Sequence, residues 1–492
     1  MDYDVLIVGG GVVGCAVARE LSKYRISVGL LEKEPDVSLG TSCRNSGVLH
    51  AGFNYTPGTL RARLCVRGNA MMDELCRDLK VKIKRIGKMT IALDESDMPA
   101  LERLKAQGDA NGVPGLEIIS PERMNAIQPG VQGFAALWSP TSSIISPFGL
   151  TIALAENACA NGAEIRLGWR AASVCRIDAG GFEVKNDAGE CLTCRVLVNA
   201  AGVFADEVCR MAGITNYRIY PCRGEYYVLD KRLDGSLKTL LYPTPRPHEP
   251  GLGIHLTPTV DGNILIGPSA NYQQSPVWYG NKAEVMESLR KEGARLLPTI
   301  RMSDYIRSFS GIRAKQTPPE VGGNADFVVE DRADASGFIN VMGIESPGLT
   351  SSPAIAEMVR GYAANHLPLE PKDDFRAERP GSALLFCERS PQERADLIAS
   401  DPDYGEIICR CESVTRREVL DALSNPLGAR TFASLKYRSR VSMGRCQGGF
   451  CTPKIARILQ EEFGWDWDSF TSHSAASRLF AGRVLEGGDS SC

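Results

Sequence analysis

Apolar residues at the start of the chain are grouped as in a strand, a turn and a helix that follow one another. Residues 3–8 form an apolar run that predicts a buried strand, and the glycine-rich stretch 9–14 predicts a tight turn. A helix is expected over residues 15–24, followed by a second strand over residues 27–31. This alternation of strands and helices indicates an α/β fold with a parallel sheet.

Three glycines of the turn have a spacing with a physical use. Gly9, Gly11 and Gly14 form the pattern G-x-G-x-x-G, which allows a tight turn, close approach of the backbone to a pyrophosphate, and close packing of helix on strand. Glu32 ends the second strand, where a carboxylate can accept bonds from both ribose hydroxyls and repel a 2′-phosphate. These residues together predict that the segment binds an adenine dinucleotide without the extra phosphate.

A polar, glycine-rich loop follows over residues 41–52. In a dinucleotide-binding fold, such a loop lies where the ribityl chain and ring of a flavin run. Its cofactor-binding candidates are Thr41, Ser42, Asn45, Ser46 and Gly47. His50 is the only histidine in the first half of the chain. A lone histidine is more often structural, but small neighbours permit close approach, so both a structural role and a role beside the flavin stay open.

The strand-and-turn pattern returns twice further along the chain. A strand over residues 195–198 stops at the small-residue turn 199–202, and another over residues 338–341 stops at the turn 343–348. Ligands bind at the carboxyl ends of strands in doubly wound sheets, so both turns supply cofactor-binding candidates. These are Ala201, Gly202, Gly343, Gly348, Leu349 and Thr350.

Between these returns lie segments rich in β-forming residues. They cover residues 217–229, 239–242, 253–256 and 263–266, and they predict an inserted antiparallel sheet. We therefore expect a Rossmann-like cofactor domain assembled from separate pieces, an inserted substrate (cap) domain, and a linker rich in Pro, Asp, Glu and Arg before a small helical domain. The expected ranges are 1–75, 145–215 and 320–366 for the cofactor domain, 76–144 and 216–319 for the cap, 367–403 for the linker, and 404–492 for the last domain.

Four cysteines of the last domain form two close pairs, Cys409 with Cys411 and Cys446 with Cys451. Two such pairs can converge on one metal centre. Structural zinc usually uses pairs separated by two to four residues, so the single-residue spacing of the first pair favours an iron–sulfur cluster over zinc, and zinc over free thiols. Most other cysteines stand singly in apolar surroundings and are expected to be small buried residues. The C-x-x-C of Cys191 and Cys194 has no second pair nearby and is expected to be structural.

Composition narrows the class of protein. A length of 492 residues suffices for two or three domains, and a net charge of −3 gives no signature of nucleic-acid binding. The apolar runs are too short for a membrane helix, and the chain starts on a core strand without a leader, which predicts a cytoplasmic protein. Peripheral contact at the inner face of a membrane stays open. The sixteen cysteines are not expected to form disulfides in that reducing compartment.

The motifs together resemble a known family. Residues 9–14, Glu32, 199–202 and 343–350 resemble the FAD-dependent oxidoreductases related to D-amino-acid oxidase, over roughly residues 1–370. Within that superfamily, the stretches that resemble the L-2-hydroxyglutarate dehydrogenase or oxidase branch are 45–52, 55–58, 242–245 and 253–258. Residues 408–415 and 443–451 resemble the [2Fe–2S] domain of bacterioferritin-associated ferredoxins, and a similar domain ends the large subunit of anaerobic glycerol-3-phosphate dehydrogenases.

The resemblance implies FAD, a [2Fe–2S] cluster and an enzyme that oxidises a secondary alcohol. A one-electron centre on the same chain favours a dehydrogenase, which passes electrons to a partner subunit or quinone, over an oxygen-consuming oxidase. The superfamily commonly places anion-binding residues where Arg313 and Arg223 lie, and guanidinium groups suit carboxylate or phosphate. Either His50 or His255 is expected to take the hydroxyl proton.

Local motifs favour an L-2-hydroxy acid such as L-2-hydroxyglutarate as the substrate. The domain architecture favours sn-glycerol 3-phosphate, which is the runner-up. A third alternative is a non-catalytic electron-transfer subunit that binds FAD and docks a partner through its cluster. The presence of Arg313, His50 and His255 opposes that alternative.

Overall fold

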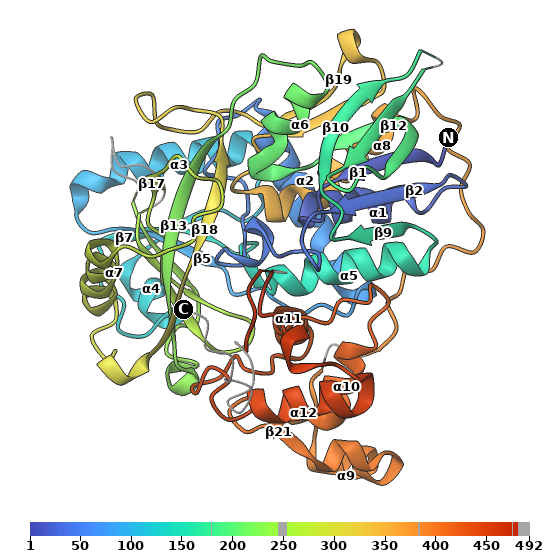
Figure 1. The fold of residues 1–492 in the computed structure, drawn as a ribbon. Coiled ribbons are helices and arrows are strands. Elements are labelled where there is room, and N and C mark those ends of the chain that lie inside the picture. The colour runs from blue at the N-terminus through green and yellow to red at the C-terminus, as the bar shows by residue number, and fades with distance from the viewer. Residues whose placement is uncertain (179, 245–252, 382–383, 475, 481–492) are drawn as a thin grey trace, which may run out of the picture.

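The computed structural model describes residues 1–178, 180–244, 253–381, 384–474 and 476–480. Figure 1 shows an α/β region that contains the expected dinucleotide-binding segments, which we call the cofactor region, with a second sheet beside it. A small helical module lies at the C-terminal end of the chain. Within the described ranges, no helix is both long and apolar enough to cross a membrane. The expected α/β architecture is confirmed.

The first sheet combines parallel strands with an antiparallel hairpin at one edge. Strand β1 (Tyr3–Val8) pairs in parallel with β2 (Val28–Glu32) on one side and with β12 (Cys191–Asn199) on the other. Its remaining strands are β9 (Glu164–Leu167), β10 (Ala171–Arg176), β11 (Phe182–Asn186), β19 (Val328–Asp331) and β20 (Phe338–Met342). The carboxyl ends of β1, β12 and β20 therefore lie together, although they come from distant parts of the sequence.

Helices cover the first sheet. Helix α1 (Val12–Leu21) is buried along its whole length, because α5 (Pro147–Ala160) and α8 (Gly348–Ala363) pack on it. The expected helix over residues 15–24 thus begins and ends three residues earlier. Gly11 is its N-cap and Gly14 lies inside it. The other helices of this half of the chain are α2 (Leu60–Asp78), α3 (Met98–Ala110), α4 (Pro121–Ile127) and α6 (Ala205–Met211).

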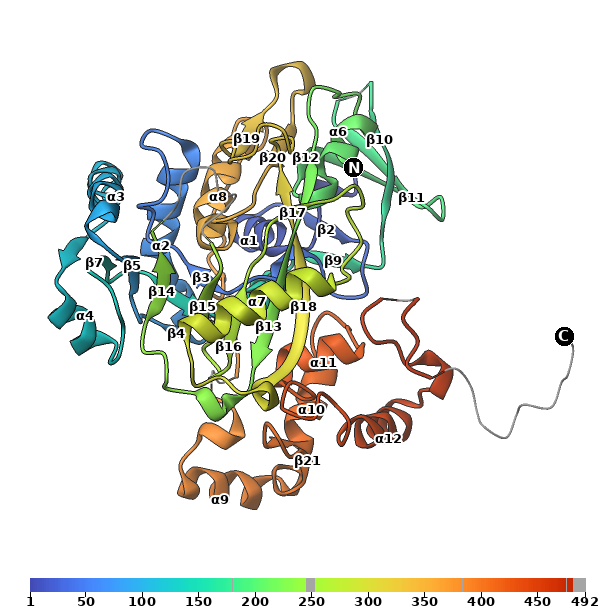
Figure 2. The same ribbon diagram turned by 90° about the vertical axis from the view of Figure 1, so that its left-hand side faces the viewer.

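The second sheet is mainly antiparallel and is built from two stretches of chain. Its strands are β5 (Lys88–Ala92), β6 (Glu117–Ile119), β7 (Ala135–Ser139), β13 (Tyr220–Leu229), β14 (Leu240–Pro243), β15 (His255–Pro258), β16 (Ile264–Gly267), β17 (Asn271–Tyr272) and β18 (Tyr305–Lys315). Helix α7 (Ala283–Leu296) lies across β13 and β16, as Figure 2 shows. A small sheet of β3 (Val48–Leu49), β4 (Ile83–Lys84) and β8 (Ser143–Ile145) adjoins it.

The stretch expected to be a linker, 367–403, contains a helix. Helix α9 (Pro391–Ser400) begins with a capping box in which Ser390 and Glu393 bond reciprocally. The segment before α9 lies against α5, where the carbonyl of Arg376 accepts bonds from Asn157 and Asn161. This part of the chain is therefore attached to the cofactor region by its backbone.

The C-terminal module has its own apolar core. It contains the hairpin β21 (Ile407–Cys409) and β22 (Val414–Thr415), then α10 (Arg416–Leu423), α11 (Phe432–Ser439) and α12 (Thr452–Phe463). Leu435, Ile455 and Phe470 are buried in this core. Helix α11 lies beside α5 of the cofactor region (Figure 1), and Glu412 of the module pairs with Lys231 after β13, so the module contacts the rest of the molecule in more than one place.

Candidate active site and cysteine cluster

The glycine turn after β1 has the conformation that its spacing predicts. Gly9 has φ +112°, in the left-handed region, and a Cβ on Gly14 would lie 1.9 Å from the Gly9 carbonyl oxygen. A side chain at Gly14 would therefore push α1 away from the turn. Residues Gly11, Val12 and Val13 at the start of α1 line the cavity described below, so the positive end of the helix faces it.

Glu32 is held beside this turn. One carboxylate oxygen accepts from Gly10 N at 2.7 Å and the other from Glu34 N at 2.9 Å. Burial raises the pKa of the Glu32 carboxyl to about 7, while these two N–H groups oppose the rise. A fixed carboxyl that lines the cavity beside a glycine turn fits the ribose of an adenine dinucleotide.

A cavity of about 580 Å³ runs from the glycine turn to the second sheet. The predicted cofactor residues that line it are Gly9, Gly11, Glu32, Thr41, Ser42, Asn45, Ser46, Ala201, Gly202, Gly348 and Leu349. Four predicted cofactor residues are not part of the described cavity lining: Gly14, Gly47, Gly343 and Thr350. Thr350 instead accepts a bond from His50 N at 2.9 Å, and Gly47 has φ +67° with no room for a Cβ beside the Ile145 carbonyl.

His255 lines the end of the cavity away from the glycine turn. Its Nδ1 lies 2.9 Å from the Gly253 carbonyl oxygen, which can only accept, so Nδ1 carries the proton. Its ring stacks on Tyr242 with 3.9 Å between centroids. Burial lowers the pKa of His255 to about 3, and Nε2 has no hydrogen-bond partner in the described part of the chain. His255 is therefore a neutral imidazole with a free lone pair at Nε2.

His50 lines the same cavity but is held differently. Its Nε2 lies 3.3 Å from Ser346 Oγ, and its Nδ1 is buried without a hydrogen-bond partner among the described residues. Burial lowers the pKa of His50 well below its ordinary value. Both predicted histidines thus reach one cavity, and the nitrogen with a free lone pair and a fixed tautomer belongs to His255.

Lys88 lies beside the histidines and was not predicted as a site residue from the sequence. It is 1% exposed, and its Nζ lies 3.1 Å from Asn54 Oδ1, 4.3 Å from the Phe53 ring centre and 4.6 Å from the Tyr242 ring centre. Burial lowers the pKa of Lys88 to about 7. The only hint in the sequence was its place on an alternating strand, where most lysines face solvent.

The two predicted arginines have different surroundings. Arg313 lines the cavity and donates from both Nη atoms to the Ser269 carbonyl oxygen at 3.2 Å. Arg223 is missing from the described cavity lining. It is 1% exposed, pairs with Glu225 at 2.8 Å and lies 4.0 Å from the Trp278 ring centre. Neighbouring residues of a strand face opposite sides, so Gly224 faces the cavity and Arg223 does not.

Two further cations lie near Arg313 and were missed from the sequence. Lys315 Nζ is 3.3 Å from Glu345 Oε2, and Arg61 Nη2 is 3.2 Å from Glu345 Oε1. All of these side chains line the cavity. Three cations against one carboxylate make this end of the cavity suitable for a dianion.

The four cysteines of the C-terminal module lie in two contacting pairs, Cys409 with Cys451 and Cys411 with Cys446. Cys409 and Cys451 are buried, whereas Cys411 and Cys446 are exposed. The backbone N–H of Phe450 is the main group that lowers the pKa of the Cys446 thiol. N–H groups directed at sulfur suit thiolate ligands of a cluster. In the described residues, no three Cys, His, Asp or Glu side chains are close enough to hold a single metal ion.

Comparison with known proteins agrees with both parts of the molecule. Residues 4–361 match the family of FAD-dependent oxidoreductases (DAO), and residues 407–461 match the BFD-like [2Fe–2S] binding domain. The chain therefore belongs to the DAO family of FAD-dependent oxidoreductases and carries a C-terminal BFD-like [2Fe–2S] domain. The predicted enzyme class and both cofactors are confirmed, which decides against zinc and free thiols.

The names of individual relatives contain two different substrates. The chain is 39% identical to a glycerol 3-phosphate dehydrogenase of Caloramator mitchellensis, with 98% of each chain covered. It is 32% identical to the mitochondrial L-2-hydroxyglutarate dehydrogenase of Caenorhabditis elegans, covering 75% of this chain and 94% of that protein. It superposes on the FAD-bound L-α-glycerophosphate oxidase of Mycoplasma pneumoniae with a TM-score of 0.71 and 27% identity, covering 77% of this chain and 98% of that chain.

Proposed function

We propose that this FAD-dependent dehydrogenase oxidises sn-glycerol 3-phosphate to dihydroxyacetone phosphate and passes the electrons through its [2Fe–2S] cluster to a partner subunit or quinone. The supporting observation is the similarity to a glycerol 3-phosphate dehydrogenase along 98% of the chain, the cluster module included. The L-2-hydroxyglutarate dehydrogenases match over about three quarters of it.

The charge of the cavity supports a phosphate. Arg313, Lys315 and Arg61 lie at one end, and Glu345 neutralises only one of them. A phosphate monoester at neutral pH carries close to two negative charges on one group, whereas L-2-hydroxyglutarate divides two charges between its ends. A site with several cations at one end suits the phosphate, whose two negative charges lie on one group.

The residues near Arg313 can activate the alcohol. Arg313 orients the anion, and Nε2 of His255 accepts the proton of the substrate hydroxyl. The Gly253 carbonyl holds the His255 ring in the tautomer that this role requires. FAD, when bound, supplies the acceptor for the hydride that leaves the carbon bearing this hydroxyl.

L-2-Hydroxyglutarate, the first expectation from the sequence, is the second candidate. Relatives with this activity are 29–32% identical over 73–75% of the chain. A hydroxy acid would place one carboxylate on Arg313, and His255 would have the same role.

Anaerobic bleaching of the flavin in the full-length protein separates the candidates. We expect sn-glycerol 3-phosphate to reduce the flavin, with slower cluster reduction afterwards, while glycerol and sn-glycerol 1-phosphate serve as controls for phosphate and stereochemistry. Reduction by L-2-hydroxyglutarate alone would select the second candidate. Reduction by neither compound would contradict both and leave the non-catalytic alternative.

A further inference from the structure

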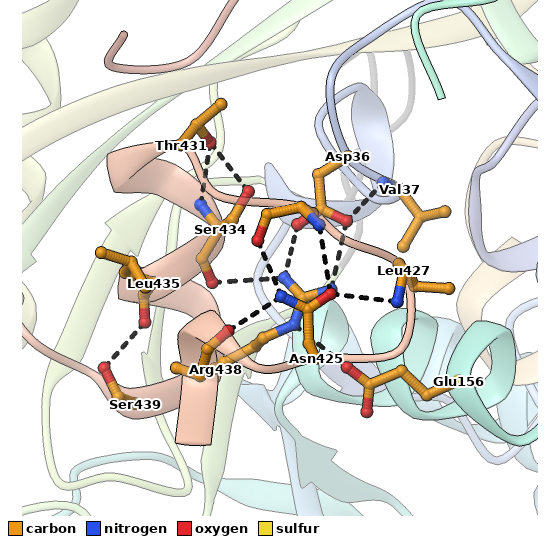
Figure 3. Close-up of polar contacts among 12 residues, drawn as sticks. Asp36, Val37, Glu156, Asn425, Leu427, Thr431, Ser434, Leu435, Arg438 and Ser439 are labelled. Carbon is orange, nitrogen blue, oxygen red and sulfur yellow. Dashed lines mark hydrogen bonds and ion pairs between the residues drawn. The ribbon is translucent and has the colours of Figure 1, made fainter. Parts of the chain in front are cut away.

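Three side chains of the C-terminal module hold the loop 36–44, which lies on the glycine turn. Arg438 on α11 pairs with Asp36 in the loop and donates to Glu156 on α5 at 3.0 Å (Figure 3). Tyr437 interacts with the Cys43 thiol. His473 Nε2 lies 2.8 Å from Arg44 Nη2. The loop itself contacts the turn, because Ser38 N donates to the Gly10 carbonyl and Ser42 Oγ accepts from Val12 N.

Arg44 is a cation that lines the FAD cavity without a carboxylate. Its guanidinium lies 4.2 Å from the Tyr279 ring centre. Within the described ranges it forms no ion pair, and its Nε is buried without a hydrogen-bond partner. Arg44 is half-buried, and a guanidinium with a buried N–H is normally paired, so this one is suited to receive an anion.

His473 reaches the same cavity from the end of the cluster module. Burial and the nearby Arg44 charge lower the pKa of His473 to about 4, so its ring is neutral at pH 7. Its Nε2 also lies 3.1 Å from the Leu39 carbonyl oxygen. A guanidinium can only donate, so the ring holds the Arg44 side chain beside the cavity in the tautomer with the proton on Nδ1, in which Nε2 accepts from Arg44.

The tail that carries His473 is fixed to α11. Phe432 N donates to the Thr471 carbonyl at 3.1 Å, and Ala433 N donates to the Ser472 carbonyl at 2.9 Å. The same helix carries Tyr437 and Arg438, which hold the loop of Arg44. The position of Arg44 therefore depends on the cluster module from two directions.

We propose that Arg44 binds the diphosphate of FAD and that His473 is its positioning residue, so the cluster module forms part of the flavin-binding site. The diphosphate is the charged group of FAD, and Arg44 shares the cavity with Gly9 and Gly11 of the turn. The backbone N–H groups of the turn are neutral donors, and a guanidinium adds a charge-assisted bond. This inference concerns cofactor binding and is independent of the proposed substrate.

The test uses full-length protein stripped of FAD and titrated with FAD or riboflavin, with flavin fluorescence as the readout. Arg44→Gln should weaken FAD binding about 10- to 100-fold. It should leave riboflavin, which lacks phosphate, bound as in the wild type. Arg44→Lys should weaken FAD binding less than Arg44→Gln does, because lysine keeps the positive charge. Arg103→Gln, on the exposed side of α3, is the matched control and should change neither affinity.

His473 is tested by coupling. His473→Ala should weaken FAD binding by less than Arg44→Gln, and adding it to Arg44→Gln should cause no further loss. His366→Ala, at the end of the cofactor region, is the matched control. Wild-type FAD affinity in Arg44→Gln, or an equal loss for riboflavin, would overturn the diphosphate assignment. Fully additive losses in the double variant would overturn the positioning role. If Arg44→Gln does not fold, Arg44→Lys decides by the same ratio of FAD to riboflavin affinity.

Discussion

Replacement of Arg313 tests the proposed anion-binding end of the cavity. Two of the five N–H groups of this guanidinium donate to the Ser269 carbonyl, which fixes the plane of the guanidinium and leaves the remaining donors for a substrate anion. Arg313→Lys keeps the charge but loses the planar fork, and Arg313→Ala loses both. Lys315 and Arg61 remain in either variant, so anion binding should be weakened and not abolished.

The size of the effect follows from the bonds at stake. Charge-assisted hydrogen bonds contribute about 1.5–3 kcal/mol, so Arg313→Ala should lower kcat/KM for flavin reduction by roughly 10- to 150-fold. The lysine variant should lie between the alanine variant and the wild type. FAD content should stay unchanged in both.

Anaerobic stopped-flow reduction of the flavin measures this effect. Arg290→Ala removes a half-buried arginine of α7, which pairs with Glu287 beside the same sheet, and serves as the control. If Arg313→Ala reduces its flavin at the wild-type rate with both sn-glycerol 3-phosphate and L-2-hydroxyglutarate, no anion is held at Arg313 and the reasoning is wrong.

Three further predictions concern other parts of the molecule. Because the pKa of His255 falls from 6.5 to about 3 on burial, the unfolded state binds more protons between those values, so stability should fall as pH drops below 6.5; His255→Gln should reduce that slope in thermal melts. Cys446→Ser should remove cluster absorbance but leave substrate-driven flavin reduction nearly intact; loss of flavin reduction with FAD still bound would refute this order of electron flow. Arg438→Met leaves Asp36 buried without its cation and Glu156 with Arg379 alone, and it should destabilise the protein by about 3–5 kcal/mol in denaturant titration; an unchanged midpoint would show that the Arg438–Asp36 pair is not buried in solution.

The sequence predicted those features that local geometry demands. Gly9 and Gly14 are required by a turn that leaves no space for Cβ atoms, and their spacing, taken with the flanking strand, the helix and Glu32, predicted the dinucleotide-binding fold. Glu32 and the cysteine pairs were likewise predicted from spacing. The helix α9 was missed inside the expected linker, although Ser390 and Glu393 form a capping box that can be read from the sequence.

The missed site residues depend on tertiary contacts. Arg223 and Arg313 were both predicted to bind the substrate anion, but the register between β13 and β18 pairs Arg313 with Cys222 and Arg223 with Ile312, so the two arginines take opposite faces of the sheet. Arg61 lines the cavity from α2, Lys88 lies beside the histidines on β5, and neither carries a motif. His473 lies 429 residues from Arg44 along the chain, and only the fold brings the two together.

The buried ion pair between Arg438 and its two carboxylates also limits how the cluster can move. The side-chain exposures are 4% for Arg438, 0% for Asp36 and 7% for Glu156. Movement of the C-terminal module away from the cofactor region would therefore break buried ion pairs and leave charges unpaired. A domain that moves during electron transfer needs an interface that opens at a low cost in free energy. The buried ion pairs of Arg438 make the opening of this interface costly. In the proposed transfer from FAD to the cluster, electrons would therefore cross a fixed gap by tunnelling, and the rate of that transfer should be independent of solvent viscosity.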